Sequence, residues 1–287
     1  MSKWRIGAVT VTRILEMEHE GIVGSEFLMP DATPEAVRRI AWLAPHFADT
    51  EGRLKMSFHA FLVETPTAKI LVDTCIGADK ERGIPDLDRL QTPFLENLAA
   101  ANCPRESVDT VLCTHLHIDH VGWNTMRVDG RWVPTFPNAR FLLHEAEFEY
   151  WRAQKDDHIH EIVFADSVKP VWDAGLVSLV ATDHRVCDEV RLVPTPGHTP
   201  GHVSVLISSQ GEEALITGDF LHHPCQFVHP EWGTVADSDR AQAAQTRRTK
   251  FDEFAGRPIL VLGTHFMPPT GGRVVRDGDA YRFEPGA

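Results

Sequence analysis

The stretch CTHLHIDHVGW, residues Cys113–Trp123, places three histidines and one aspartate within six positions. They are His115, His117, Asp119 and His120. The preceding apolar run predicts a buried strand that ends where the histidines begin. One isolated histidine is most often a solvated or hydrogen-bonded residue, but this density needs another explanation. A divalent cation supplies it, because imidazole nitrogens and a carboxylate are zinc ligands and the imidazoles must be neutral to bind.

Alternate positions of an extended segment face the same way, so His115 and His117 can serve one cation while Asp119 and His120 turn toward a second. Three later apolar strands end in a further ligand type, namely His198 in PTPGHTPGH, Asp219 in LITGDF and His265 in VLGTHF. Loops at such strand ends are where α/β proteins usually build their sites. We expect the four strand ends to converge on one binuclear site.

Composition and net charge limit the classes of partner and substrate that fit this protein. The chain has 287 residues, 43% of them hydrophobic, and a net charge of −13, which argues against nucleic acid as a partner and favours a small-molecule substrate. No run of 18 apolar residues indicates a membrane segment, and the start MSKWRIGAVTV lacks a secretory signal pattern, so we expect a cytoplasmic protein. Five cysteines without a CxxC predict reduced, mostly buried thiols. A homodimer is left open.

Turn and cap residues predict a chain of mixed strands and helices. Thr33 before Pro34 and Thr92 before Pro93 are typical of helix starts. One strand is expected over residues 4–16, hairpins over 57–77, 126–136 and 272–283, a strand over 139–144, a helix over 145–154 and two strands over 191–209. Residues 21–30 and 44–53 are expected to be loop. No internal repeat marks a domain boundary.

At these motifs the chain resembles the metallo-β-lactamase superfamily, whose H-x-H-x-D-H signature matches residues 115–120 and whose later ligands match His198, Asp219 and His265 in order. The resemblance implies an α/β, four-layer αβ/βα sandwich forming a single domain over residues 1–287, with about 13–55 as a substrate-side loop and helix. It also implies how the ligands are shared. The first metal takes His115, His117 and His198, the second takes Asp119, His120 and His265, and Asp219 bridges both.

Two further positions carry over from the resemblance. Asp73 in ILVDT matches an earlier family aspartate that supports a ligand from behind. Cys75 stands where family members usually have glycine, a departure that concerns local packing more than chemistry.

Two divalent ions, expected to be Zn²⁺ with Fe, Mn or Co as alternatives, would provide a bridging hydroxide as nucleophile at neutral pH. The sequence therefore predicts a metal-dependent hydrolase of a lactone or carboxylic ester. A phosphotriester or phosphodiester hydrolase is the alternative with the same machinery, and an iron-dependent redox enzyme is the alternative of another class. Asp119 is the candidate proton carrier to the leaving group.

Within the family the chain looks most like the lactonase and methyl parathion hydrolase-like group, through SEFLMPDATPE and GDFLHHPCQF. Lactonases of that group commonly carry a tyrosine three residues after the bridging aspartate, where this chain has His222. His222 is a candidate hydrogen-bond donor to a developing oxyanion, with packing as the alternative.

Other histidines and aromatics near the motifs are expected to be structural. His202 is interpreted as orienting or packing beside His198, and His144 and His223 as packing residues. His158 and His160 are expected in a solvated polar turn. The core is the expected place of Trp123, Phe220 and Phe266.

Overall fold

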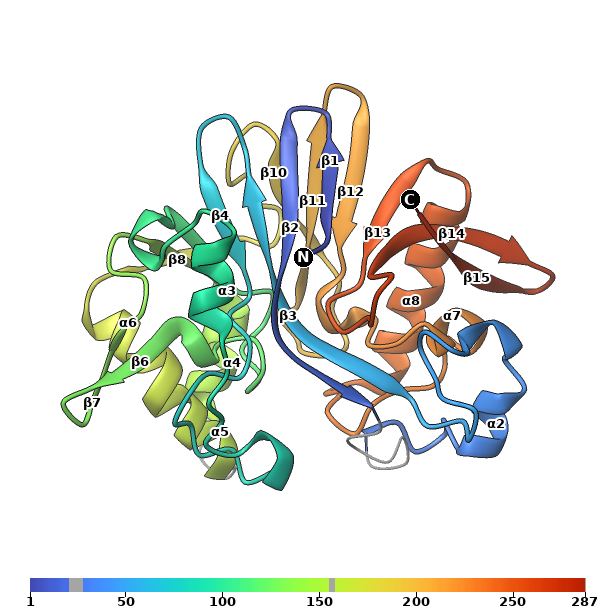
Figure 1. Cartoon of the computed structure of the whole chain (residues 1–287), viewed down its shortest axis with the longest axis horizontal. Helices are drawn as coiled ribbons and strands as arrows, with labels where there is room; N and C mark the ends of the chain where they lie inside the picture. The colour runs from blue at the N-terminus through green and yellow to red at the C-terminus, as the bar shows by residue number, and fades with distance from the viewer. Residues whose placement is uncertain (21–27, 155–157, 287) are drawn as a thin grey trace. The chain divides into compact units, whose positions relative to one another are not determined.

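A computed structural model describes residues 1–20, 28–154 and 158–286 (Figure 1). The chain divides into an N-terminal unit, Met1–Met17 with Phe58–His184, and a C-terminal unit, Glu18–Ser57 with Arg185–Ala287. Each unit packs a buried apolar cluster of its own. Most of the loop predicted over residues 21–30, and part of the SEFLMPDATPE stretch, lie outside the described residues.

The N-terminal unit is built on a mixed sheet that has seven strands among the described residues, in the order β1-β2-β3-β4-β5-β8-β9. The strands are β1 (Lys3–Ile6), β2 (Val9–Glu20), β3 (Lys55–Glu64), β4 (Lys69–Val72), β5 (Thr110–Leu112), β8 (Arg140–His144) and β9 (Val177–Val180). The last four are paired in parallel. Their carboxyl ends therefore meet at one edge, and the residues after β4 and β5 are Asp73 and the histidine motif.

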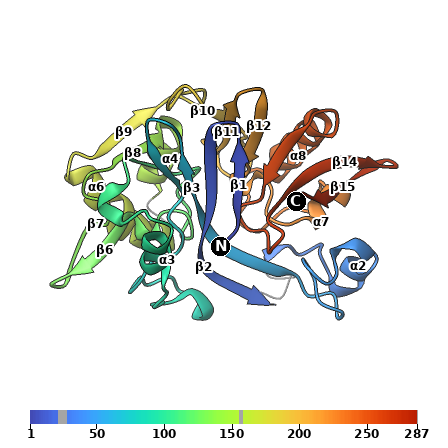
Figure 2. The same cartoon turned by 45° about the horizontal axis from the view of Figure 1, so that its top comes forward.

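Short helices and turns connect these strands. They are η2 (Pro85–Leu87), α3 (Phe94–Ala100), η3 (Arg105–Ser107), η4 (Gly122–Asn124), α4 (Glu145–Ala153), α5 (His158–Val163), the π-helical turn η5 (Phe164–Val168) and α6 (Lys169–Asp173). The hairpin of β6 (Thr125–Val128) and β7 (Arg131–Pro134) extends from this unit in both views (Figures 1 and 2). Its turn residues, Asp129 and Gly130, have φ of 49° and 77°, as a tight hairpin requires.

The C-terminal unit has a six-stranded sheet among its described residues, in chain order from β10 to β15. The strands are β10 (Val190–Pro194), β11 (Val203–Ser209), β12 (Glu212–Ile216), β13 (Ile259–Leu262), β14 (Gly271–Asp277) and β15 (Ala280–Pro285). Only β12 and β13 are parallel among these pairs, so the chain leaves both at the same edge. Asp219 and His265 follow these two strand ends directly.

The helices among the described residues of the C-terminal unit are α2 (Pro34–Arg38), η1 (Ala41–Leu43), η6 (Gly218–Phe220), α7 (Cys225–Val228) and α8 (Arg240–Ala255). The longest of these, α8, packs beside β14 (Figure 2). Phe251 and Phe254 on its inner face are buried in the apolar cluster of this unit. No helix was predicted from the sequence between residues 240 and 255, where polar side chains dominate the exposed face.

Local signals predicted many of the elements, and two predictions near the N-terminal strands and helix α3 need correction. Thr33 caps α2 as predicted, since its hydroxyl accepts a hydrogen bond from the Ala36 amide. Thr92 does not cap α3, because its hydroxyl donates instead to buried Glu16, and the helix begins one residue later than expected. The single strand predicted over residues 4–16 is the hairpin β1–β2, since Gly7 takes a φ of 56° and turns the chain.

All five cysteines are free thiols and four of them are buried, as the sequence predicts. Across residues 1–20, 28–154 and 158–286, none of the helices combines the length and the apolar character needed to cross a bilayer.

Candidate metal centre

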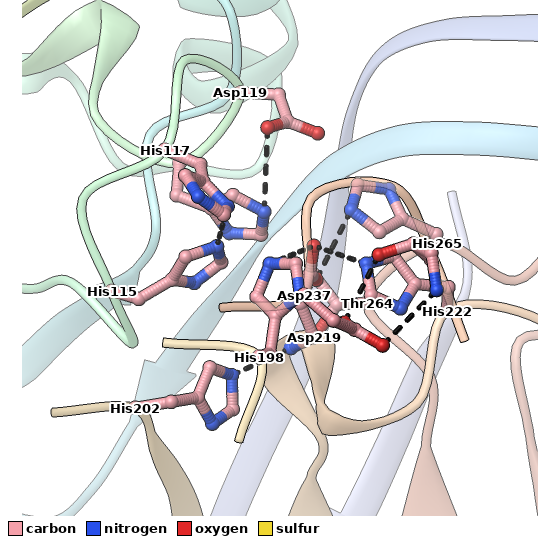
Figure 3. A network of polar contacts seen from close by, with 12 residues as sticks. His115, His117, Asp119, His198, His202, Asp219, His222, Asp237, Thr264 and His265 are labelled. Carbon is pink, nitrogen blue, oxygen red and sulfur yellow. Dashed lines mark hydrogen bonds and ion pairs between the residues drawn. The ribbon is translucent and has the colours of Figure 1, made fainter. Parts of the chain in front are cut away.

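The histidine motif follows β5 in the N-terminal unit. His115 and His120 are fully buried, while His117 and Asp119 are half-buried. The Nδ1 atom of His115 lies 3.1 Å from the Thr114 hydroxyl, and its Nε2 atom lies 3.0 Å from Nδ1 of His117 (Figure 3). The Thr114 hydroxyl donates to Asp73, so it can accept the Nδ1 proton of His115. Nε2 of His115 is then a bare nitrogen directed at its neighbour.

Asp73 holds this loop from the end of β4. Its carboxylate accepts the Thr114 amide at 2.7 Å and lies 2.9 Å from Nδ1 of His120. A carboxylate only accepts, so His120 carries its proton on Nδ1 and its unprotonated Nε2 can bind a cation. The supporting contact that the resemblance implies for Asp73 is therefore present. Cys75, at the position where the family usually has glycine, has a φ of 50°, in the left-handed region that favours glycine.

The C-terminal unit brings three predicted ligands together at one sheet edge. His198 lies in the turn between β10 and β11, Asp219 in η6 after β12, and His265 after β13. All three are buried. The Oδ2 atom of Asp219 lies 3.6 Å from Nε2 of His198, and its Oδ1 atom lies 3.2 Å from Nε2 of His265 (Figure 3). The two oxygens of Asp219 thus face different histidines.

The partners behind these histidines decide which nitrogen carries the proton. Nδ1 of His198 lies 2.8 Å from Asp237 Oδ1, and Nδ1 of His265 lies 3.1 Å from the carbonyl of Ser57. Both partners are acceptors, so both imidazoles are protonated on Nδ1 and direct bare Nε2 atoms at the Asp219 carboxylate. Lone pairs facing a buried carboxylate repel one another unless a cation lies between them. The donor set therefore fits a divalent cation at each oxygen of Asp219.

Asp237 was not predicted from the sequence. It lies in the loop before α8, where its carboxylate also accepts the amide and hydroxyl of Thr234. Burial raises its pKa, but the hydrogen bond from His198 and nearby positive charge outweigh burial and lower the pKa to about 2. The residue is thus a fixed anion behind His198. Its only sequence signal is a lone aspartate 39 residues after the ligand, which is too weak to find it.

Two of the histidines interpreted as structural have clear partners. Nε2 of His202 accepts the amide of Asp219 at 2.7 Å, and its Nδ1 bonds Thr195, so His202 orients Asp219 rather than binding metal in its place. His223 contacts the Phe47 carbonyl at 2.8 Å. His144 ends β8 and is half-buried. The three aromatics expected in the core are buried, namely Trp123, Phe220 and Phe266.

The predicted solvated polar turn at His158 and His160 is wrong. Residues 155–157, just before it, lie outside the described residues. These histidines are in helix α5 rather than in a polar turn. The ring of His160 packs against Trp151 at 4.0 Å between centroids and stacks with His117 at 6.1 Å. Apolar Ile159 and Val163 give the segment a packing face that outweighs its polar start. His160 is therefore a neighbour of the metal-ligand motif.

His222 lies beside Asp219 in the C-terminal unit. Its Nε2 atom is 3.1 Å from Asp219 Oδ2, and its ring lies 4.6 Å from that of His198 (Figure 3). Burial lowers the pKa of His222, so the imidazole is neutral at pH 7. Its side chain is only 3% exposed.

Residues 59–269 match the family model of the metallo-β-lactamase superfamily, which is more than half of the chain. The chain belongs to this superfamily. Among curated proteins, an N-acyl homoserine lactonase of Bacillus cereus is 25% identical over 238 residues, covering 77% of this chain and 86% of the lactonase. Gamma-lactamase FDB1 of Fusarium pseudograminearum is 28% identical over 173 residues, covering 55% of this chain and 39% of that protein.

Solved structures agree on the fold. The hydrolase AbOPH of the β-lactamase superfamily superposes with a TM-score of 0.82 at 26% identity and covers 99% of this chain and 97% of its own. The dizinc quorum-quenching lactonase AidC superposes with a TM-score of 0.80 at 20% identity, covering 100% and 97%. The chain has the metallo-β-lactamase fold with mixed α/β sheets, as predicted, and is a metal-dependent hydrolase.

Proposed function

We propose that this metal-dependent hydrolase uses two divalent cations, with zinc as the proposed metal, to hydrolyse a small lactone or carboxylic ester. One observation carries the binuclear part: each carboxylate oxygen of Asp219 faces a bare Nε2 atom, one from His198 and one from His265. A carboxylate presented in this way suits a bridge between two cations. When bound, the cations supply Lewis acidity and lower the pKa of water toward neutrality.

The proposed ligand sets are those implied by the family motif. The first cation takes His115, His117 and His198, the second takes Asp119, His120 and His265, and Asp219 contributes to both. Support comes from within each unit. His115, His120, His198 and His265 each place an acceptor behind Nδ1, which leaves Nε2 available.

A lactone or ester is the proposed substrate class because the curated relatives include N-acyl homoserine lactonases. The match to this chain spans 86% of the length of each of these two lactonases. The aspartate at the bridging position adds support, because the true β-lactamases of the superfamily lack it. His222 in place of the tyrosine common in lactonases points to a substrate other than the acyl-homoserine lactones.

Two residues are proposed to act on the reacting groups. Asp119 is half-buried, with one oxygen 3.6 Å from Nε2 of His120, and would carry a proton to the leaving oxygen. His222 would donate a hydrogen bond to the oxyanion that develops on the substrate. We further propose that residues 1–287 act as one cytoplasmic catalytic domain, with residues 13–55 on the substrate side and a small molecule as its partner.

A substrate panel tests the reaction class. Purified, zinc-loaded protein is assayed on lactones, aryl esters and aryl phosphotriesters, with His117→Ala as the control. We expect turnover of lactones or esters that the control lacks. Turnover of the phosphotriesters alone would establish the alternative phosphoester hydrolase. Elemental analysis of the purified protein that finds one iron and no zinc per chain would establish the redox alternative.

A further inference from the structure

Helix α8 lies directly against the turn that carries His198. The Thr246 hydroxyl, on this helix, donates a hydrogen bond to the Pro196 carbonyl at 2.7 Å. The next residue of the turn, Gly197, has a φ of 127°, and a Cβ atom there would lie 2.3 Å from the Ala243 amide nitrogen. The backbone of the turn is therefore packed against α8 too closely for any residue but glycine at this position.

Arg247, on the same helix, is fully buried, and its guanidinium group reaches three neighbours. Its Nε atom donates to the Pro230 carbonyl at 2.6 Å, and its Nη1 atom donates to the Phe220 carbonyl at 3.3 Å. Its Nη2 atom lies 3.9 Å from Oδ2 of Asp237, the distance of an ion pair without a hydrogen bond. Phe220 directly follows the proposed bridging ligand in the chain. One side chain of α8 thus contacts both the peptide beside that ligand and the carboxylate behind His198.

The charge of Arg247 bears on how Asp237 is held. An arginine keeps its proton in proteins, so the buried guanidinium presents a permanent positive charge to this carboxylate. Without it, Asp237 would keep the Thr234 amide at 3.0 Å but would be a buried anion that has lost its nearby cation. The hydrogen bond between its Oδ1 atom and Nδ1 of His198, 2.8 Å long, would then be less firmly placed (Figure 3).

We propose that Arg247 is a positioning residue of the metal centre, because it fixes Asp237 behind His198. Its bond to the Phe220 carbonyl also fixes the chain directly after Asp219. This inference rests on the proposed binuclear function and deepens it, since it assigns to α8 the task of setting the geometry of two ligands. An arginine with a purely structural role would stabilise the unit without changing how the unit binds zinc.

The zinc affinity of folded, metal-free protein tests the assignment by competition with a chelator. Arg247→Met keeps a long side chain in the buried place and removes its charge and its donors. We expect this variant to lose about tenfold in zinc affinity at one of two sites, the lower end for partners of a metal-bound histidine, because Arg247 acts through Asp237. Arg247→Lys restores a positive charge without the planar fork and should recover part of this loss.

Two further variants of α8 separate positioning from stability. Arg248→Met removes the neighbouring arginine, which is exposed and lies 3.7 Å from Glu231. Phe254→Leu removes apolar packing from the buried cluster of the unit and no polar group. We expect both variants to bind zinc with wild-type affinity, although Phe254→Leu should unfold at a lower urea concentration.

A spectroscopic measurement checks the path through Asp237. The Nδ1 proton of His198 is hydrogen-bonded to this carboxylate, so its resonance in the zinc-loaded protein should lie far downfield. In Arg247→Met it should move upfield as the bond weakens, whereas both controls should leave it in place. An unmoved resonance overturns the assignment. So does Arg247→Met binding zinc as tightly as Arg248→Met, or Phe254→Leu losing as much affinity.

The lysine variants give the same comparison if Arg247→Met does not fold. Arg247→Lys should then lose about threefold in zinc affinity while Arg248→Lys loses none, and equal affinities overturn the assignment. Wild-type protein that binds fewer than two zinc ions refutes the proposed binuclear function itself, which is a separate outcome.

Discussion

Two buried polar clusters, one in each unit, differ in how their charges are balanced. In the N-terminal unit, Arg82 bonds both oxygens of Asp166 at 2.9 and 3.2 Å, and Lys80 lies 3.6 Å from the same carboxylate. Lys80 also donates to the Thr125 hydroxyl and lies over the Trp132 ring. Both oxygens of the Asp166 carboxylate therefore meet donors from the protein, although Nε of Arg82 finds no partner among the described residues.

In the C-terminal unit, the carboxylate of Asp219 meets nitrogen atoms whose protons lie on the far side of the ring. His198 and His265 both donate Nδ1 to an acceptor behind them and present Nε2 to Asp219. These two nitrogens present lone pairs to the carboxylate. A buried cluster whose carboxylate is paired with cationic side chains stabilises the fold, whereas a cluster that directs unprotonated nitrogens at a carboxylate suits a cation.

The largest effect is expected at Asp219. Asp219→Ala removes the one carboxylate that faces both histidine nitrogens, so zinc binding at both sites should fall below detection and hydrolysis to the level of the chelator-treated protein. Elemental analysis after dialysis against zinc, together with kcat/KM, measures this. A variant that retains two zinc ions per chain would show that Asp219 is not shared between them.

The next effect compares how the central carboxylate of each cluster contributes to the free energy of unfolding. Asp166→Ala leaves Arg82 buried without its carboxylate and should cost about 3–5 kcal/mol of unfolding free energy, measured by urea denaturation. Asp219→Asn, examined without metal, should leave the unfolding free energy unchanged or raise it, because the amide no longer repels the bare nitrogens. Equal losses in the two variants would contradict the distinction between the clusters.

A smaller effect is expected at Asp237. Asp237→Ala removes the acceptor behind His198, so zinc affinity should fall about 10- to 100-fold, as is usual for partners of a metal-bound histidine. Asp239→Ala is the matched control, because Asp239 caps α8 through the Gln242 amide and should cost about 1 kcal/mol of stability. Zinc affinity in that control should stay at the wild-type value.

The smallest effect concerns how the free energy of unfolding depends on pH through the cluster of Lys80, Arg82 and Asp166. Burial lowers the pKa of Lys80 to about 7, despite the opposing attraction of Asp166, whereas the lysine in an unfolded chain titrates near 10.5. Between these values the unfolded state binds more protons, so stability rises with pH. Relative to Lys80→Met, the wild type should gain about 1 kcal/mol or more from pH 7 to pH 9 in urea unfolding. A flat difference would place the pKa of Lys80 near its ordinary value.

The sequence predicted the turns and helix starts that depend on neighbouring residues. The turn at Asp129–Gly130 and the capped start of α2 depend on residues within a few positions of one another, so the chain predicts them directly. The sequence-based prediction failed where a residue distant in the sequence binds the side chain that was expected to act locally. Thr92 satisfies buried Glu16 rather than its own helix, and α5 forms because its apolar side chains find a core to pack against.

The same division holds at the candidate metal centre. The sequence by itself determined the seven ligand candidates, because His115–His120 and the strand-end residues His198, Asp219 and His265 have fixed chemistry and a family-specific spacing. Only the tertiary structure decided which nitrogen each imidazole presents. That choice depends on Asp73, Asp237 and the Ser57 carbonyl, which reach the histidines from distant parts of the chain through hydrogen bonds that no local pattern encodes.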